Sequence, residues 1–361
     1  MRIVRDVLDD VKAGHRLSEE DALFLFNTRD RGVWEIASAA DELRQHRTGD
    51  VVTYVRNQNL NVTNICVNAC GFCGFSKKSG DSEAYYFDRD AIQEKARLAR
   101  ERGVTEVCTV SGLHPSFTAD SYIGIYESIR EALPGVHIHA SNPMEVAYAA
   151  RKSGISTKEV LIRMKEAGLG SLCGTAAEIL VDGVRRVICP GKIDTATWCR
   201  IIREAHDLGI PSTATIMYGS VEDARDRVRH LAILREIQDE THGFTEFVPL
   251  SFIHMNTPLF HSGQARAGAT GCEDLLLIAV SRLFLDNFDN VQVSWLKYGS
   301  KLAQLGLMAG GNDLGGTMYT DEVSRDAGRG DPEYLSPTEM ERICRDIGRP
   351  IRERTTLYDL R

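Results

Sequence analysis

The chain has 361 residues, of which 43% are hydrophobic, and its formal net charge is −8. This composition is typical of a globular protein with a sizeable core, and a mixed, acidic charge argues against nucleic acid as the main partner, because phosphate binding needs a basic face. The first ten residues contain no apolar core of signal-peptide length, and no apolar run approaches the length of a membrane span. We therefore expect a soluble, cytoplasmic protein without a membrane partner.

The N-terminal 50 residues are predicted to be helical. Ser18-Glu19-Glu20-Asp21 is typical of a helix start, and Leu17 ahead of it can act as a hydrophobic staple. A second amphipathic stretch covers residues 34–43. We expect a helical cap over residues 1–50, followed by a main domain over residues 51–361.

Beyond residue 50, strands and helices alternate. Strands are expected at 51–55 and 60–63, and the second leads into a loop with three cysteines. The later predicted strands are 104–110, 136–140, a short strand ending at Cys173, 210–218, 245–252, 291–295 and a short strand near 312–314. The predicted helices are 88–102, 119–133, 156–167, 195–208, 221–241, 272–287, 299–308 and 336–347.

Counted from the strand at 60–63, these elements form eight strand-helix units. Regular alternation indicates parallel strands joined by right-handed crossovers. Eight units predict an α/β fold, a closed (β/α)8 TIM-type barrel with an N-terminal helical cap; a doubly wound open sheet is the alternative. No linker rich in Pro, Gly or Ser divides the chain, so one barrel domain is expected.

Nine cysteines are an odd number for a disulfide framework. Six are scattered and are expected to be small buried residues, with Cys108 as a core residue in mid-strand. The other three, Cys66, Cys70 and Cys73, lie within eight residues. Three thiolates can ligate three irons of a cubane and leave the fourth iron open. Zinc is the alternative, but a structural zinc site usually needs a second ligand pair, and none lies nearby.

In (β/α)8 barrels, chemistry takes place on loops that follow the C-terminal ends of the strands. The unusual polar segments of this chain fall at those places: 111–115, 141–145, 174–178, 216–222, 249–254 and 294–297. The histidines there, and His137 and His139, could equally have ordinary packing roles. Glu145, Glu178 and Glu222 could equally be carboxylates that stabilise helix N-termini.

The spacing Cys66-X3-Cys70-X2-Cys73, with Phe72 before the last cysteine, resembles the signature of the radical S-adenosylmethionine superfamily. The resemblance implies a 4Fe-4S cluster on the three cysteines, with S-adenosylmethionine chelating the open iron and being cleaved to a 5′-deoxyadenosyl radical. It further implies cofactor contacts at a set of residues near the strand ends. These are Phe72, Ser111, Gly112, Ser141, Glu178, Met217 and Tyr218.

A closer resemblance covers the chain from about residue 50 onward. Segments 111–115, 174–180, 217–219, 244–250, 301–304 and 312–317 look like the subgroup that makes deazaflavin and menaquinone precursors. Within it, residues 174–180 with Ile188-Cys189-Pro190 look most like the tyrosine-using subunit of deazaflavin (Fo) synthase. Cys173 departs from the pattern, since proline would be expected there.

This resemblance implies two substrates, L-tyrosine and 5-amino-6-(D-ribitylamino)uracil. Fragmentation of tyrosine would release 2-iminoacetate, and the 4-hydroxybenzyl group would add to C5 of the uracil. A low-potential electron donor and a second radical enzyme subunit that completes the deazaflavin are the other implied partners. The polar residues available to bind the substrates are His114, Asn142, Thr175, His254, Lys297 and Asp313.

Two alternative functions stay open from the sequence. The first is a menaquinone-pathway radical enzyme that acts on a futalosine-type substrate. The second is a non-catalytic iron-sulfur electron-transfer protein, which is disfavoured because such carriers usually have four cysteine ligands.

Overall fold

A closed ring of parallel strands forms the centre of the molecule, in a computed structural model that describes residues 3–330 and 334–361. The first strand position is shared by β1 (Val52–Val55) and β2 (Asn57–Asn59). The others are β3 (Glu106–Thr109), β4 (His137–Ala140), β5 (Leu169–Leu172), β6 (Ser212–Tyr218), β7 (Phe244–Ser251), the bridge residues 291–292, and β8 (Asp313–Gly316). Parallel pairs connect β2 through β7 in order, bridges join β7 to 291 and 292 to β8, and β8 pairs with β1. The predicted (β/α)8 barrel is therefore confirmed.

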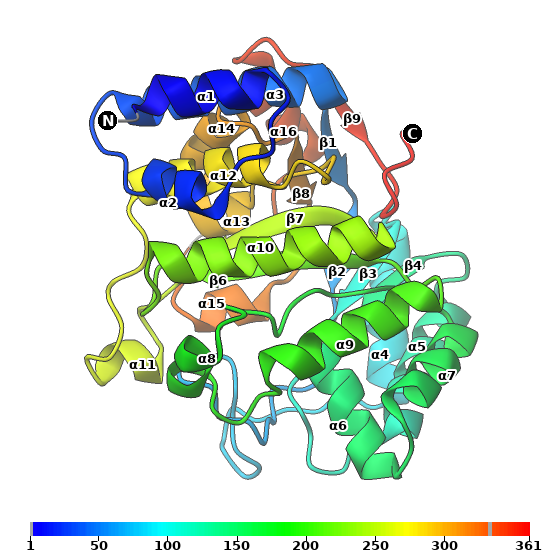
Figure 1. Ribbon diagram of the computed structural model, residues 1–361. Coiled ribbons are helices and arrows are strands. Elements are labelled where there is room, and N and C mark those ends of the chain that lie inside the picture. The colour runs from blue at the N-terminus through cyan, green and yellow to red at the C-terminus, as the bar shows by residue number, and fades with distance from the viewer. Residues whose placement is uncertain (1–2, 331–333) are drawn as a thin grey trace.

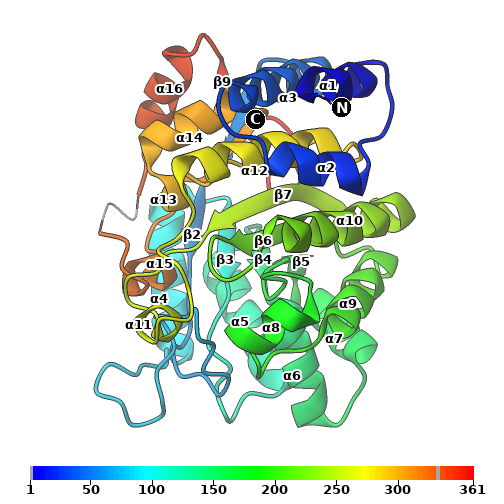
Figure 2. The same cartoon turned by 60° about the vertical axis from the view of Figure 1, so that its left-hand side comes forward.

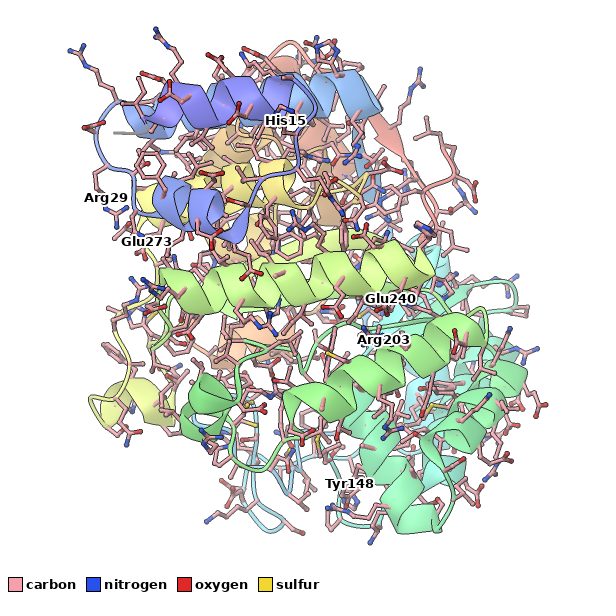
Figure 3. The ribbon with its side chains drawn as sticks, viewed as in Figure 1. His15, Arg29, Tyr148, Arg203, Glu240 and Glu273 are labelled. Carbon is pink, nitrogen blue, oxygen red and sulfur yellow. The ribbon has the colours of Figure 1, made fainter. Side chains whose placement is uncertain are left out.

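Helices cover the outside of this ring (Figures 1 and 2). The long outer helices are α4 (Arg89–Glu101), α5 (Ala119–Ala132), α6 (Pro143–Ser153), α7 (Thr157–Ala167), α9 (Thr195–Asp207), α10 (Ala224–Thr241), α12 (Gly271–Phe284), α14 (Ser300–Leu307) and α16 (Pro337–Arg345). Neighbouring helices also meet through surface ion pairs, such as Arg203 on α9 with Glu240 on α10, 2.5 Å apart between Nε and Oε2 (Figure 3). Exposed pairs of this kind contribute little, about 0–1 kcal/mol, so apolar packing carries the helical layer.

The N-terminal helices are α1 (Val4–Lys12), α2 (Glu19–Phe26) and α3 (Gly32–Thr48). α2 packs against α10 and α12, α3 packs against α12, and α1 packs on α3. The Ser18 hydroxyl caps α2 by accepting the Asp21 N–H at 3.1 Å, and Leu17 is buried, as the sequence pattern predicted. These helices lie at the end of the molecule opposite the cysteine loop (Figures 1 and 2). They cover outer helices and leave the barrel mouth free. The division of the chain into two domains at residue 50 stays a prediction.

The strand predicted at 60–63 is wrong. The barrel ladder ends with the Leu60 N–H, which donates to the Cys108 carbonyl, because the Val62 N–H is taken by the Ser111 hydroxyl at 2.8 Å. The first strand is instead formed by β1 and β2, upstream of that segment. The chain then bends into the cysteine loop.

Several short elements were not predicted. They are α8 (Asp182–Ile188), α11 (Pro258–His261), α13 (Trp295–Tyr298), α15 (Glu322–Asp326) and β9 (Ile351–Glu353). α6 was also missed, although Asn142 caps it and Pro143 occupies its first turn. Both residue types are typical of a helix start.

The C-terminal segment closes the barrel at the end away from the cysteine loop. β9 pairs with the start of β1, and the side chain of Arg354 beyond it reaches Asp313 at the start of β8. That guanidinium donates to both Asp313 carboxylate oxygens, at 2.5 and 3.0 Å, and is 1% exposed. This buried pair forms part of the floor of the barrel.

Across the part of the chain that the structure describes, no helix combines the length and the apolar character needed to cross a bilayer.

Candidate active site

The barrel encloses a cavity of about 400 Å³, and the cysteine loop forms part of its wall. The predicted site residues that line it come from six separate segments of the barrel. They are Cys66, Cys70, Phe72, Cys73, Ser111, Gly112, Asn142, Thr175, Glu178, Met217 and Lys297. The chain fold therefore brings together most residues that the sequence motifs indicated.

Backbone contacts with distant segments hold the cysteine loop. The Gly71 N–H donates to the Ile188 carbonyl at 2.9 Å, and the Gly71 carbonyl accepts the Leu259 N–H at 2.8 Å. Among the described residues, one group of three potential ligands has donor atoms within 4.8 Å of one another, and it contains none of the loop cysteines. The three loop thiols therefore do not all lie within 4.8 Å of one another, which suits ligands of separate irons.

Ser111-Gly112 lies directly against the cysteine loop. A Cβ atom on Gly112 would be 2.4 Å from the Ile65 carbonyl oxygen, so no larger residue fits without a shift. The Gly112 N–H donates to the Thr63 carbonyl at 2.8 Å. This close approach fixes the loop after β3 relative to the thiols.

Glu145, on the first turn of α6, is a cavity residue that the sequence analysis left undecided. Its Oε1 accepts the Ser111 N–H at 3.4 Å, and its Oε2 is buried without a partner. Burial raises the pKa of this carboxyl to about 8. Asn142-Pro143 is a typical helix start, and this signal in the sequence is enough to predict that Glu145 lies in the first turn of a helix.

Glu178 forms a buried ion pair with Lys192, which the sequence analysis missed. The Lys192 ammonium also lies 5.2 Å from the centre of the Phe72 ring. Burial disfavours the charged lysine, but the Glu178 carboxylate outweighs it and the pKa of Lys192 is raised. A fixed positive charge therefore lies beside the cysteine loop.

Two predicted cofactor residues do not line the cavity. The Ser141 hydroxyl is buried against the Tyr126 hydroxyl at 2.6 Å. The Tyr218 hydroxyl donates to Asp274 on α12 at 2.6 Å. Side chains alternate across a strand, so Met217 faces the lumen and its neighbour Tyr218 faces the helices.

Three predicted substrate residues also lie off the cavity wall. His114 contacts Ser116 and packs with Tyr86 and Phe117, and the His254 ring packs on Phe260. Asp313 is fully buried in its pair with Arg354. The first two have packing roles and the third helps to close the floor.

Cys108 was predicted to be a core residue, and this is wrong. It is half-buried and faces the lumen, where it lines the cavity together with His139 and Cys173. A β-branched run predicts the strand but does not show that the lumen of this barrel is polar. Glu106, Glu246 and Gln292 line the same deep part.

Among the described residues, several cavity-lining side chains have buried polar atoms with no hydrogen-bond partner. They are Asn59, Asn61, Asn68, Glu145, Thr175 and Thr356. A buried polar group without a partner costs about 1–3 kcal/mol, so such atoms are expected to be paired when a ligand is bound. The cavity fits polar ligands, and the three free thiols fit iron.

A barrel of this kind with three cysteines at its mouth defines the radical S-adenosylmethionine class. The chain matches the model of the Radical SAM superfamily over residues 60–234 and that of the CofH/MqnC C-terminal region over residues 241–361. Methylornithine synthase (PylB) has the same fold, with a TM-score of 0.75, 18% identity, and coverage of 96% of this chain and 97% of that one. The [FeFe]-hydrogenase maturase HydG from Carboxydothermus hydrogenoformans superposes with a TM-score of 0.77 at 16% identity, covering 98% of this chain and 80% of that one.

Near relatives identify the family within this class. The chain is 68% identical over 357 residues to the 5-amino-6-(D-ribitylamino)uracil–L-tyrosine 4-hydroxyphenyl transferase of Methanoculleus marisnigri, covering 99% of this chain and 97% of that enzyme. It is 47% identical over 348 residues to the enzyme of the same name from Methanocaldococcus jannaschii, covering 95% of this chain and 97% of that enzyme. The chain belongs to this family of radical transferases. Radical SAM enzymes use a 4Fe-4S cluster and S-adenosylmethionine, and the thiols and unpaired polar atoms of the cavity fit both.

Proposed function

We propose that the chain fragments L-tyrosine and couples its 4-hydroxybenzyl group to C5 of 5-amino-6-(D-ribitylamino)uracil, releasing 2-iminoacetate, as a step of deazaflavin synthesis. The observation that carries this proposal is 68% identity over almost the whole chain to a transferase named for these two substrates. The same relatives favour it over a futalosine-type substrate and over pure electron transfer.

The cavity residues nearest the cysteine loop have complementary roles in this proposal. When bound, the cluster and S-adenosylmethionine supply the 5′-deoxyadenosyl radical. Cys66, Cys70 and Cys73 would hold the irons, and the free Glu145 oxygen, beside Ser111-Gly112, would accept a hydrogen bond from the methionyl amino group. Lys192 would attract the methionyl carboxylate.

The remaining cofactor contacts come from the next strands. Glu178 and Met217 line the cavity after β5 and on β6. In this proposal they would contact the ribose and the adenine. Phe72, within the cysteine loop, also lines the cavity. Ser141 and Tyr218 act indirectly, by fixing the backbone of their loops through Tyr126 and Asp274.

Deeper side chains suit the two substrates. Lys297 lines the cavity, and its ammonium donates to the Ser324 hydroxyl at 2.5 Å. Burial lowers the pKa of Lys297, so an anionic carboxylate such as that of tyrosine would be a favourable neighbour for its charged form. Thr175, Asn59 and Asn61 offer unpaired polar atoms to the ribityl hydroxyls and the uracil ring.

An anaerobic product assay tests the reaction. The reduced, cluster-bearing enzyme is incubated with S-adenosylmethionine, tyrosine and the ribitylaminouracil, and products are identified by mass spectrometry. We expect 5′-deoxyadenosine together with the hydroxybenzyl adduct of the uracil. A parallel incubation with a futalosine-type substrate should give no product.

The control is Cys70→Ala, which should lose the cluster and both products while the barrel stays folded. Formation of 5′-deoxyadenosine by that variant would contradict the ligand assignment. If the wild type forms 5′-deoxyadenosine but no adduct, the proposed transfer is contradicted. If an enzyme with full iron content forms neither of the two products, the electron-transfer alternative is favoured.

The proposal includes partners and a compartment. A low-potential electron donor must reduce the cluster, and a second radical SAM subunit would use the adduct to complete the deazaflavin. The nine cysteines are all free thiols, which suits a reducing cytoplasm.

A further inference from the structure

Three potential metal ligands converge deep in the barrel wall, away from the cysteine loop. They are Cys108 on β3, His139 on β4 and Cys173 directly after β5, and their donor atoms all lie within 4.8 Å of one another. Cys108 pairs in register with His139, and His139 with Ser171. Cys173 lies two residues beyond Ser171 and so faces the same side of the sheet. Three neighbouring strands thus place three soft ligands on one patch of the lumen.

We propose that Cys108, His139 and Cys173 bind a thiolate-preferring divalent cation of the zinc type, with a fourth coordination position open to the cavity. Two thiolates and one imidazole with an open position are a known donor set for reactive zinc sites. A zinc–sulfur bond of about 2.3 Å puts tetrahedral sulfurs about 3.8 Å apart, so the ligands need to close by about 1 Å at most. Side-chain rotation covers that difference.

The second observation is the hydrogen bonding of the imidazole. The Ser171 hydroxyl contacts His139 Nδ1 at 2.7 Å and His137 Nε2 at 2.8 Å. This contact orients the His139 ring and leaves Nε2 for a ligand, as the supporting partners of metal-bound histidines do.

Strand geometry excludes a disulfide between the two thiols. Cys108 and Cys173 belong to strands separated by β4, and neighbouring strands are about 4.8 Å apart. The two Cα atoms are therefore roughly 9 Å apart, whereas a disulfide needs less than about 7 Å. A metal ion is the linkage that matches the spacing of the sulfurs.

The charges of the site also balance. Two thiolates and one dication with a neutral imidazole have no net charge, so the buried site avoids the cost of an uncompensated ion. The open position would face the polar lumen, where Glu106 and Gln292 also lie. Cys173, which departs from the family pattern of the loop, gains a role as one of the ligands.

Zinc titration of the holoenzyme tests the site without any substrate. The reconstituted enzyme, with its iron content measured, is titrated anaerobically with Zn²⁺ against a chromogenic chelator. We expect one zinc per chain with no loss of iron, and a zinc X-ray absorption spectrum with two sulfur and one nitrogen neighbours. Because neither tyrosine nor the uracil is used, failure of the product assay and failure of this site are distinguishable.

Variants identify the ligands. Cys108→Ser and Cys173→Ser should each weaken zinc binding by about 100-fold or more, and Ser171→Ala, which removes only the supporting hydroxyl, by about 10–100-fold. The matched control is Cys199→Ser, a buried cysteine on α9 outside the cavity, which should bind zinc as the wild type does. Circular dichroism and iron content verify that each variant is folded, and the milder Ser171→Ala serves if a cysteine variant does not fold.

Three outcomes would overturn the proposal. They are the absence of zinc from the wild type, unchanged affinity in both cysteine variants, and zinc uptake matched by loss of iron, which would place the metal on the loop cysteines. In those cases the thiols are only part of the cavity wall.

Discussion

At the residue scale, several buried side chains that line the cavity have polar atoms without a hydrogen-bond partner. Glu145 is the most costly of them, because a carboxyl is harder to bury than an amide or a hydroxyl. Its Oε1 accepts the Ser111 N–H at a long 3.4 Å, and its Oε2 has no partner. A protein that keeps such a group is expected to use it with a ligand.

Glu145→Gln should flatten the pH dependence of stability in the enzyme without S-adenosylmethionine. The folded pKa is about 8, above the ordinary value of 4.5, so the native state holds one more proton than the unfolded state between these values. Stability of the wild type therefore falls as pH rises from 5 to 8, by on the order of 2–4 kcal/mol from this group. Glutamine has no proton to lose, and the variant should lack this contribution.

Melting temperatures of the anaerobic holoenzyme at pH 5.5 and pH 8 measure the difference. Between pH 5.5 and pH 8, the melting temperature of the wild type should fall by several degrees more than that of Glu145→Gln. Glu35→Gln, at an exposed glutamate of α3, is the control and should behave as the wild type. Equal losses in all three proteins would show that Glu145 is already charged in the ligand-free cavity.

At the element scale, the cysteine loop depends on the loop after β3. Gly112→Ala should reduce the iron content of the reconstituted protein severalfold, because a methyl group 2.4 Å from the Ile65 carbonyl must push the loop backbone away. The matched control is Gly124→Ala in the middle of α5, where a Cβ has open space. This control should keep its iron and gain about 0.5–1 kcal/mol, since alanine favours a helix over glycine. Full iron in Gly112→Ala would mean that the two loops are not mechanically coupled.

The sequence predicts the long elements of this fold well because their patterns are local. α4, α7 and α9 begin at capping residues and present an apolar stripe, and their predicted bounds differ from the observed ones by at most one residue. β2 was missed because its sequence is Asn57-Gln58-Asn59, which shows no hydrophobic run. Because this strand has polar side chains that face a polar lumen, a search for hydrophobic patterns in the sequence does not find it.

The site was predictable as a set of loops but not side chain by side chain. A motif places Met217 and Tyr218 at the same strand end, yet only the register of β6 decides which of them faces the cavity. Partners such as Lys192 for Glu178 come from another segment and have no local signal. Cys108 lies in an apolar run, and only its neighbours on β4 and β5 reveal that it faces potential ligands.

At the scale of the whole molecule, residues from three separate segments of the C-terminal part of the chain meet in the barrel floor. Arg354, which follows β9, pairs with Asp313 on β8, lies 3.6 Å from Glu246 on β7, and covers the Tyr358 ring at 3.9 Å. The Tyr358 hydroxyl donates to Glu246 at 2.8 Å. Burial raises the pKa of Glu246 to about 7 even though Arg354 opposes the shift. One guanidinium therefore compensates two buried carboxyl groups.

Arg354→Met should destabilise the enzyme by about 3–5 kcal/mol, because it leaves both carboxyl groups buried without a cation. This loss of stability should be larger at higher pH. Without the guanidinium the folded pKa of Glu246 rises further, so the native state holds a proton that the unfolded state has lost, and stability falls as pH increases. Melting temperatures at pH 5.5 and pH 8 measure this, with Arg352→Met as the control at the exposed neighbouring arginine of β9.

A second substitution separates charge from packing at the same position. In Arg354→Met with Glu246→Gln, one of the two uncompensated carboxyl groups is gone, so part of the lost stability should return at pH 8 and little at pH 5.5, where the Glu246 carboxyl is largely protonated. A loss in the single variant that is independent of pH, and that the second substitution does not reduce, would mean that Arg354 acts only through its contacts with the Tyr358 ring and the barrel wall. The floor would then be closed by packing, and the buried charges of Asp313 and Glu246 would need another source of compensation within the lumen.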